Sequence, residues 1–91
     1  MFEELSVIID DRKNRPRSDS YTSSLFAKGE DVILKKIGEE AMEVILAAKG
    51  QGNERLVEES ADLIYHLLVL LSFYGLSIED VEVELYRRHA E

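Results

Sequence analysis

Two short groups of acidic residues stand in stretches of the chain that are otherwise apolar. The first, in KKIGEEAMEV, contains Glu39, Glu40 and Glu43, and the second, in EESADLIYHLLVLL, contains Glu59 and Asp62. Residues three apart share one face of an α-helix, so Glu40 pairs with Glu43 and Glu59 pairs with Asp62. Carboxylate pairs at this spacing are suited to holding a hard divalent cation and to moving a proton.

The elements that must position these acids are helices. Apolar spacing, caps and glycines predict helices over residues 2–14, 21–28, 30–49, from a cap at Asn53 to residue 74, and over 78–89. Gly29 is expected to end the second helix in the left-handed conformation, and residues 50–53 (GQGN) read as a four-residue turn. No segment has the period of a strand. We therefore expect one all-α domain over residues 1–91, a small helical bundle built around two long antiparallel helices.

The helical periods indicate where the acids point. At 100° per residue, the first long helix has one apolar stripe, with Glu40 at its edge and Glu43 and Glu39 further round. The members of that stripe are Ile33, Ile37, Ala41, Val44, Ile45 and Ala48. On the second long helix, Glu59 and Asp62 project from the face that also carries Val69. An antiparallel hairpin then places the two acidic pairs opposite each other at similar depth.

Four carboxylates in one sheltered place need a counter-charge. At an effective dielectric constant of about 20, two like charges about 6 Å apart repel by roughly 3 kcal/mol, and burial adds to this cost. Protonation, basic partners or bound cations can relieve the repulsion. Arg55 and Lys49 are the basic residues nearby on the same helices. An all-oxygen ligand set in a chain without cysteine favours Mg²⁺, or alternatively Mn²⁺, over zinc.

Composition limits the partners. The net charge of −8 argues against binding to nucleic acid and to an anionic membrane surface. Seven of the eleven Lys and Arg residues precede the first acidic group, and an anionic small molecule can bind in that part of the chain. The absence of cysteine and of a signal peptide predicts a cytoplasmic protein. A chain this short buries only about two-thirds of its surface, and both long helices are apolar on more than one face. We therefore expect a homodimer or higher homo-oligomer, in which helices of both chains complete the bundle.

The acidic pattern resembles the metal signature of the all-α nucleoside-triphosphate pyrophosphatase superfamily, which includes the MazG-like enzymes. Further segments, SYTSSLFAKGEDVILKKIGEEAMEVILAAKG and ADLIYHLLVLL, resemble the phosphoribosyl-ATP pyrophosphatases of histidine biosynthesis, over about residues 15–88. The resemblance implies Mg²⁺-dependent hydrolysis of the α–β phosphoanhydride of phosphoribosyl-ATP to phosphoribosyl-AMP and pyrophosphate. It implies that Glu39 and Glu40 are catalytic, Glu39 as a further ligand or as the base that orients water. The implied metal ligands are Glu40, Glu43, Glu59 and Asp62.

Substrate contacts are expected in the segment before the acids. Tyr21 is suited to stacking on a base or ribose, and the hydroxyl of Thr22 either binds phosphate or caps its helix. The lysines of this region are expected to bind phosphate; they are Lys28, Lys35 and Lys36. His66 is expected to be a core histidine bonded to a neighbour.

Two other functions fit the same acids. One is a house-cleaning nucleotide pyrophosphatase of the MazG-like type with a different pocket, and the other is a non-catalytic helical interaction module whose acids are solvated. A di-iron carboxylate bundle is disfavoured because it uses Glu-x-x-His pairs, and Leu63 stands three residues before His66.

Overall fold

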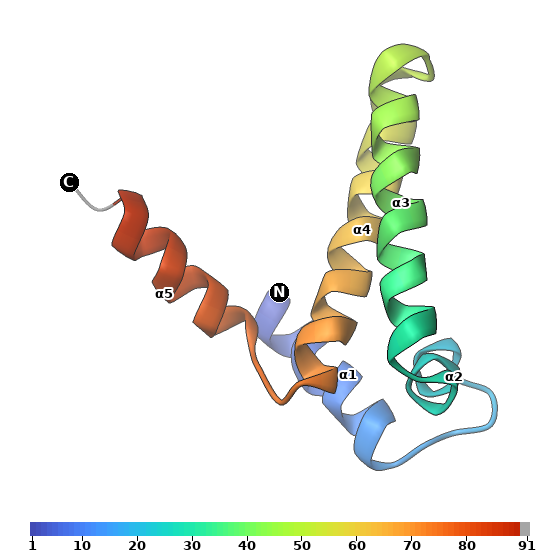
Figure 1. The fold of residues 1–91 in the computed structure, drawn as a ribbon, viewed down its shortest axis with the longest axis vertical. Helices are drawn as coiled ribbons and strands as arrows, with labels where there is room; N and C mark the ends of the chain where they lie inside the picture. Colours follow the sequence, from blue (N-terminus) through green and yellow to red (C-terminus); the bar gives the residue numbers. More distant parts are fainter. Residues whose placement is uncertain (90–91) are drawn as a thin grey trace.

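The computed structural model describes residues 1–89, and every regular element in that range is an α-helix. The five helices are α1 (Phe2–Asn14), α2 (Tyr21–Lys28), α3 (Glu30–Gly50), α4 (Gly52–Phe73) and α5 (Ile78–His89). The predicted all-α class is confirmed. Helices α3 and α4 run side by side in opposite directions, with α1 and α2 at the base of this hairpin, while α5 extends away from it (Figure 1).

The turn at the tip of the hairpin is shorter than the sequence indicated. A single residue, Gln51, separates α3 from α4 and occupies the N-cap position of α4 without a side-chain cap bond. The predicted four-residue turn with a cap at Asn53 is therefore wrong. Gly52 has a φ of 88°, which a residue without a Cβ adopts at little cost, and this lets the chain reverse within fewer residues.

The junction between α2 and α3 also depends on a glycine. Gly29 ends α2 and caps α3 with φ 98° and ψ −176°. This is not the left-handed conformation that the sequence suggested, but the extended positive-φ region that is essentially restricted to glycine. The two helices can therefore follow each other with one residue between them.

The buried core lies at the base of the hairpin. It is formed by Ile9 of α1, Leu25 of α2, Ile33 of α3, and Leu68 and Val69 of α4. Helix α5, described as far as His89, contributes no buried residue. The packing of α1 and α2 against the base of the hairpin thus fixes the relative positions of α3 and α4, close to the helical turns that carry the acidic residues.

No helix among residues 1–89 is by itself long and apolar enough to cross a membrane. The segment Asn53–Phe73 together with α5 passes the same test of length and composition only as a pair bent by 106°.

Candidate metal and active site

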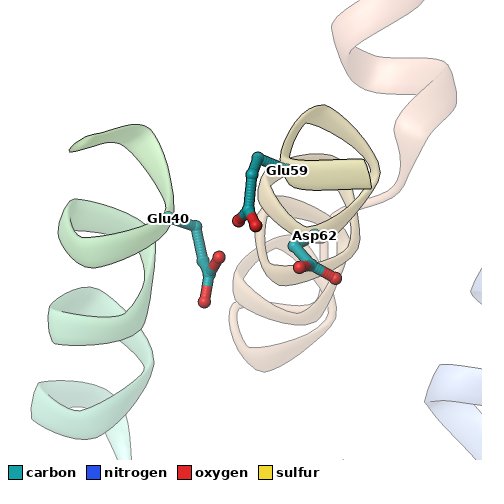
Figure 2. A group of neighbouring side chains, drawn as sticks. All are labelled: Glu40, Glu59 and Asp62. Carbon is teal, nitrogen blue, oxygen red and sulfur yellow. The ribbon is translucent and has the colours of Figure 1, made fainter. Parts of the chain in front are cut away.

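Three acidic side chains from two helices meet at the seam of the hairpin. Glu40 reaches from α3 toward Glu59 and Asp62 on α4 (Figure 2). One carboxylate oxygen from each of the three lies within 4.8 Å of the others. Glu59 is only 5% exposed, whereas Asp62 is open to solvent and Glu40 is intermediate. The cluster therefore has a sheltered side and an open side.

Glu40 lies nearer to the centre of the inward face of α3 than the sequence indicated. Ile33 and Ala47 are the buried residues of this helix, and Ile37 and Val44 are half-buried. At 100° per residue these positions share a sector with Glu40, which is about 60° from Ile37. Four of the six members of the predicted stripe are buried or half-buried, but Ile45 is 56% exposed and Ala48 is exposed as well, so the inward face is rotated toward Glu40.

The cluster lines an open groove of about 570 Å³. The lining residues are Lys36, Glu39, Glu40, Met42, Glu43, Glu59 and Asp62. Glu43 therefore lies in the groove but outside the closest group of three. The side chain of Glu39 is 52% exposed, which leaves it accessible to water. All five predicted acids lie in or beside this groove.

Two basic side chains offset part of the negative charge. The Lys36 ammonium is 3.2 Å from Glu40 and 3.8 Å from Glu39, and the hydrogen bond with Glu40 raises the pKa of Lys36. On the other helix, Arg55 pairs with Glu58 at 3.0 Å and with Glu59. Arg55 was expected near the acids from its position on α4, whereas Lys36 was predicted as a phosphate contact and not as a counter-ion.

These two cations do not neutralise the cluster. Burial raises the pKa of Glu59 above its ordinary value, and Arg55 opposes this shift. Asp62, Glu43 and Glu40 raise the pKa of Glu59 further, because each adds negative charge nearby. Burial and the neighbouring acids disfavour the ionised form of Glu59 even though Arg55 is in contact with it. A divalent cation bound here would stabilise that ionised form.

The donor set fits a hard divalent cation. Oxygen ligands sit about 2.0–2.1 Å from Mg²⁺ and somewhat further from larger ions, so opposite ligands are separated by roughly 4–5 Å. The three oxygens within 4.8 Å meet this condition with small side-chain adjustments. Water would complete the shell of such an ion on the open side, since Mg²⁺ usually keeps several waters.

The predicted substrate contacts are distributed unevenly. Lys36 lines the groove. The hydroxyl of Tyr21 is 2.9 Å from Nε2 of His66, while Thr22 is buried and its hydroxyl bonds with that of Tyr65. Lys28 and Lys35 are exposed and do not line the groove, so the structure does not gather them with the acids.

The polar contacts around α2 were only partly foreseen. The cap of α2 is Ser20, whose Oγ accepts from the Ser23 amide, so the capping alternative for Thr22 is wrong. His66 is buried and bonded to neighbours, as expected. Its partnership with Tyr21 was not predicted, because it joins residues 45 positions apart and no local pattern reports such a contact.

The fold and the site together define an all-helical protein with a cluster of three carboxylates at the seam of a helical hairpin. Comparisons with known proteins narrow this class. A family model described as phosphoribosyl-ATP pyrophosphohydrolase matches residues 2–89. Because the match covers nearly all of the chain, the protein belongs to the phosphoribosyl-ATP pyrophosphohydrolase family, and it is a hydrolase.

Individual relatives agree with the family match. The chain is 54% identical over 88 residues to a phosphoribosyl-ATP pyrophosphatase of Pelotomaculum thermopropionicum, covering 97% of this chain and 90% of the relative. It is 49% identical over 89 residues to the phosphoribosyl-ATP pyrophosphatase of Clostridium acetobutylicum, covering 98% and 81%. It is also 50% identical over 91 residues to the histidine biosynthesis bifunctional protein HisIE of Oceanobacillus iheyensis, where it covers all of this chain but 42% of the relative.

Proposed function

We propose that this protein hydrolyses phosphoribosyl-ATP to phosphoribosyl-AMP and pyrophosphate in histidine biosynthesis, with Mg²⁺ or Mn²⁺ held by Glu40, Glu59 and Asp62. The observation that carries the proposal is the approach of these three carboxylates within 4.8 Å in a chain of this family. Glu43, which lines the same groove, is placed to act as a further ligand or to bond to the water around the ion. A bound divalent ion supplies positive charge that offsets the charge developing on the phosphate oxygens.

The remaining chemistry belongs to side chains of the groove. Water attacks the phosphorus on one side of the α–β bridging oxygen, the bond from that phosphorus to the bridging oxygen breaks, and pyrophosphate and phosphoribosyl-AMP separate. We assign Glu39 to orient the attacking water and accept its proton, because this carboxylate is exposed at the groove and stands beside Glu40. Lys36 lines the same groove and pairs with Glu40 at 3.2 Å, so its ammonium can exchange Glu40 for a phosphate oxygen.

The direct test is release of pyrophosphate from phosphoribosyl-ATP, measured as phosphate after coupling to inorganic pyrophosphatase. Wild type is expected to turn over only with Mg²⁺ or Mn²⁺, and Glu40→Gln is expected to lose most of its activity. Parallel assays on dATP and dCTP address the house-cleaning alternative. Preference for those nucleotides over phosphoribosyl-ATP would contradict the proposal.

We also propose that the working form is a homodimer or a higher homo-oligomer. The single chain has a radius of gyration of 14.4 Å, whereas a compact chain of this length has one of about 12 Å. Large apolar side chains remain exposed along the outer faces of the hairpin, for example Ile45 at 56% and Val57 at 68%. Light scattering at micromolar concentration is expected to give at least twice the monomer mass of 10.4 kDa, and a stable monomer would refute this part.

Residues 1–91 are proposed to form one domain, located in the cytoplasm. The chain spans 42% of its bifunctional relative but 81% and 90% of the two others, so relatives of similar length support a single unit. Limited proteolysis is expected to remove residues near the ends before it cuts within α3 or α4.

A further inference from the structure

His66 is a buried polar residue that the proposed hydrolysis does not use. It is 5% exposed and lies one helical turn after Asp62 on α4. Its Nδ1 is 2.7 Å from the backbone oxygen of Asp62, and a carbonyl oxygen can only accept a hydrogen bond. The proton of the neutral ring therefore sits on Nδ1, which leaves Nε2 as an acceptor.

The group that donates to Nε2 is the phenol of Tyr21, at 2.9 Å. The two rings meet edge to face, with centroids 5.8 Å apart and planes at 79°. Tyr21 is the first residue of α2 and is 51% exposed even though its hydroxyl is engaged. The hydrogen bond thus holds the polar end of the side chain inward while much of the ring faces solvent.

Tyr21 lies near the acidic groove without being one of its lining residues: its hydroxyl is linked through His66 to the backbone oxygen of Asp62, which does line the groove, and we call this place the groove rim. Burial raises the pKa of the Tyr21 phenol, the charge of Lys36 opposes that shift, and Glu40 and Asp62 add to it. Lys36, Glu40 and Asp62 all line the groove, which agrees with the position of the phenol beside it. An aromatic ring in this position is near the proposed cation site, to which the phosphates of a nucleotide would bind.

Docking of α2 does not rest on the Tyr21 contact alone. The neighbouring residue Thr22 bonds with the hydroxyl of Tyr65 between the same two helices, and Leu25 anchors α2 in the core. Both Thr22 and Leu25 are buried, whereas Tyr21 is not. The Tyr21–His66 bond therefore fixes the orientation of an exposed ring rather than the position of a helix.

We propose that His66 is a positioning residue that holds Tyr21 at the groove rim, where the ring stacks on the base or ribose of the substrate. The proposal rests on the proposed function, since it names the part of phosphoribosyl-ATP that this ring meets. Stacking of a base on an aromatic side chain contributes to binding without regard to the bond being cleaved. The expected consequence is an effect on KM and not on kcat.

The test uses matched phenol removals. Tyr21→Phe and Tyr65→Phe each delete one hydroxyl that bonds between α2 and α4, but only the first releases the rim ring. With phosphoribosyl-ATP and Mg²⁺, we expect Tyr21→Phe and His66→Leu to raise KM roughly fivefold to twentyfold with kcat within about twofold, and Tyr21→Ala to raise KM further. His66→Gln, which keeps an acceptor near the Nε2 position, is expected to restore KM toward wild type, and Tyr65→Phe to leave KM unchanged.

Several results would overturn the proposal. Equal KM values for Tyr21→Phe and Tyr65→Phe would mean that the contact only docks α2, and an unchanged KM in Tyr21→Phe would mean that the ring needs no positioning. If His66→Leu fails to fold by circular dichroism, Tyr21→Phe carries the test alone. A wild type that turns over no phosphoribosyl-ATP refutes the proposed function instead, and calorimetric binding of phosphoribosyl-AMP to wild type and Tyr21→Phe then decides the inference, with equal or absent binding counting against it.

Discussion

Removing the carboxylate of Glu40 should abolish most of the stabilisation that Mg²⁺ gives to the folded protein. Glu40 is the single member of the closest group that α3 supplies, so an ion bound to it and to Glu59 and Asp62 links the two long helices. At a Mg²⁺ concentration 100 times the Kd, binding adds about 2.7 kcal/mol to the free energy of unfolding. For a domain of this size that corresponds to a rise in Tm of roughly 10–20 °C.

The variant Glu40→Gln removes one negative charge from the ligand set. Loss of even an outer partner of a metal ligand weakens binding by about 10–100-fold, so we expect a loss of about 100-fold here. At the same Mg²⁺ concentration the gain in free energy falls to about 0.4 kcal/mol, or a Tm rise of roughly 2–3 °C. The matched control is Glu39→Gln, because Lys36 contacts both residues but Glu39 lies outside the closest group.

The assay is thermal unfolding followed by circular dichroism at 222 nm, with MgCl₂ titrated against an EDTA-treated sample. Glu39→Gln should keep nearly the full Mg²⁺-dependent rise in Tm. A similar rise in Glu40→Gln and wild type would refute the assignment of the ligands. A wild type that hydrolyses its substrate in EDTA without any response to Mg²⁺ would refute the metal site altogether.

Three further predictions concern the groove and its supports. Because the pKa of Glu59 in the folded protein is raised, the folded state of the metal-free protein holds this proton more tightly than the unfolded state. The cost of its charge should therefore shrink as the pH falls from 7 toward 5, so Glu59→Gln should raise the urea midpoint more at pH 7 than at pH 5. A gain that grows on acidification would contradict this. Lys36→Met should tighten Mg²⁺ binding in calorimetry, since Lys36 competes for Glu40, while kcat/KM falls; unchanged Mg²⁺ affinity would show that Lys36 does not screen the acids. Gly29→Ala should cost about 1–3 kcal/mol in urea unfolding because of its positive-φ extended backbone, whereas Gly38→Ala, within α3 and with open space for a Cβ, should gain up to about 1 kcal/mol.

The sequence by itself determined the helices and the identity of the acids at their seam. Helical period, Gly29 and the glycines of the GQGN segment are local signals, and the helix ends they predicted agree with the structure within about two residues. The i,i+3 spacing of Glu59 and Asp62 is local as well, since it follows from the geometry of one helix. The resemblance to the family also lies in the sequence itself, in the spacing of the acids and the segments around them.

Only the tertiary structure decided which acids come closest and what surrounds them. The rotation of α3 that places Glu40 on the inward face depends on how Ile33 packs with α1, α2 and α4, and no single helix encodes that. The one-residue turn at Gln51 followed from the backbone that Gly52 allows. The contact of Tyr21 with His66 likewise joins distant parts of the chain. Such features are set by long-range packing, in which several helices compete for one core, whereas helix formation itself is set by near neighbours.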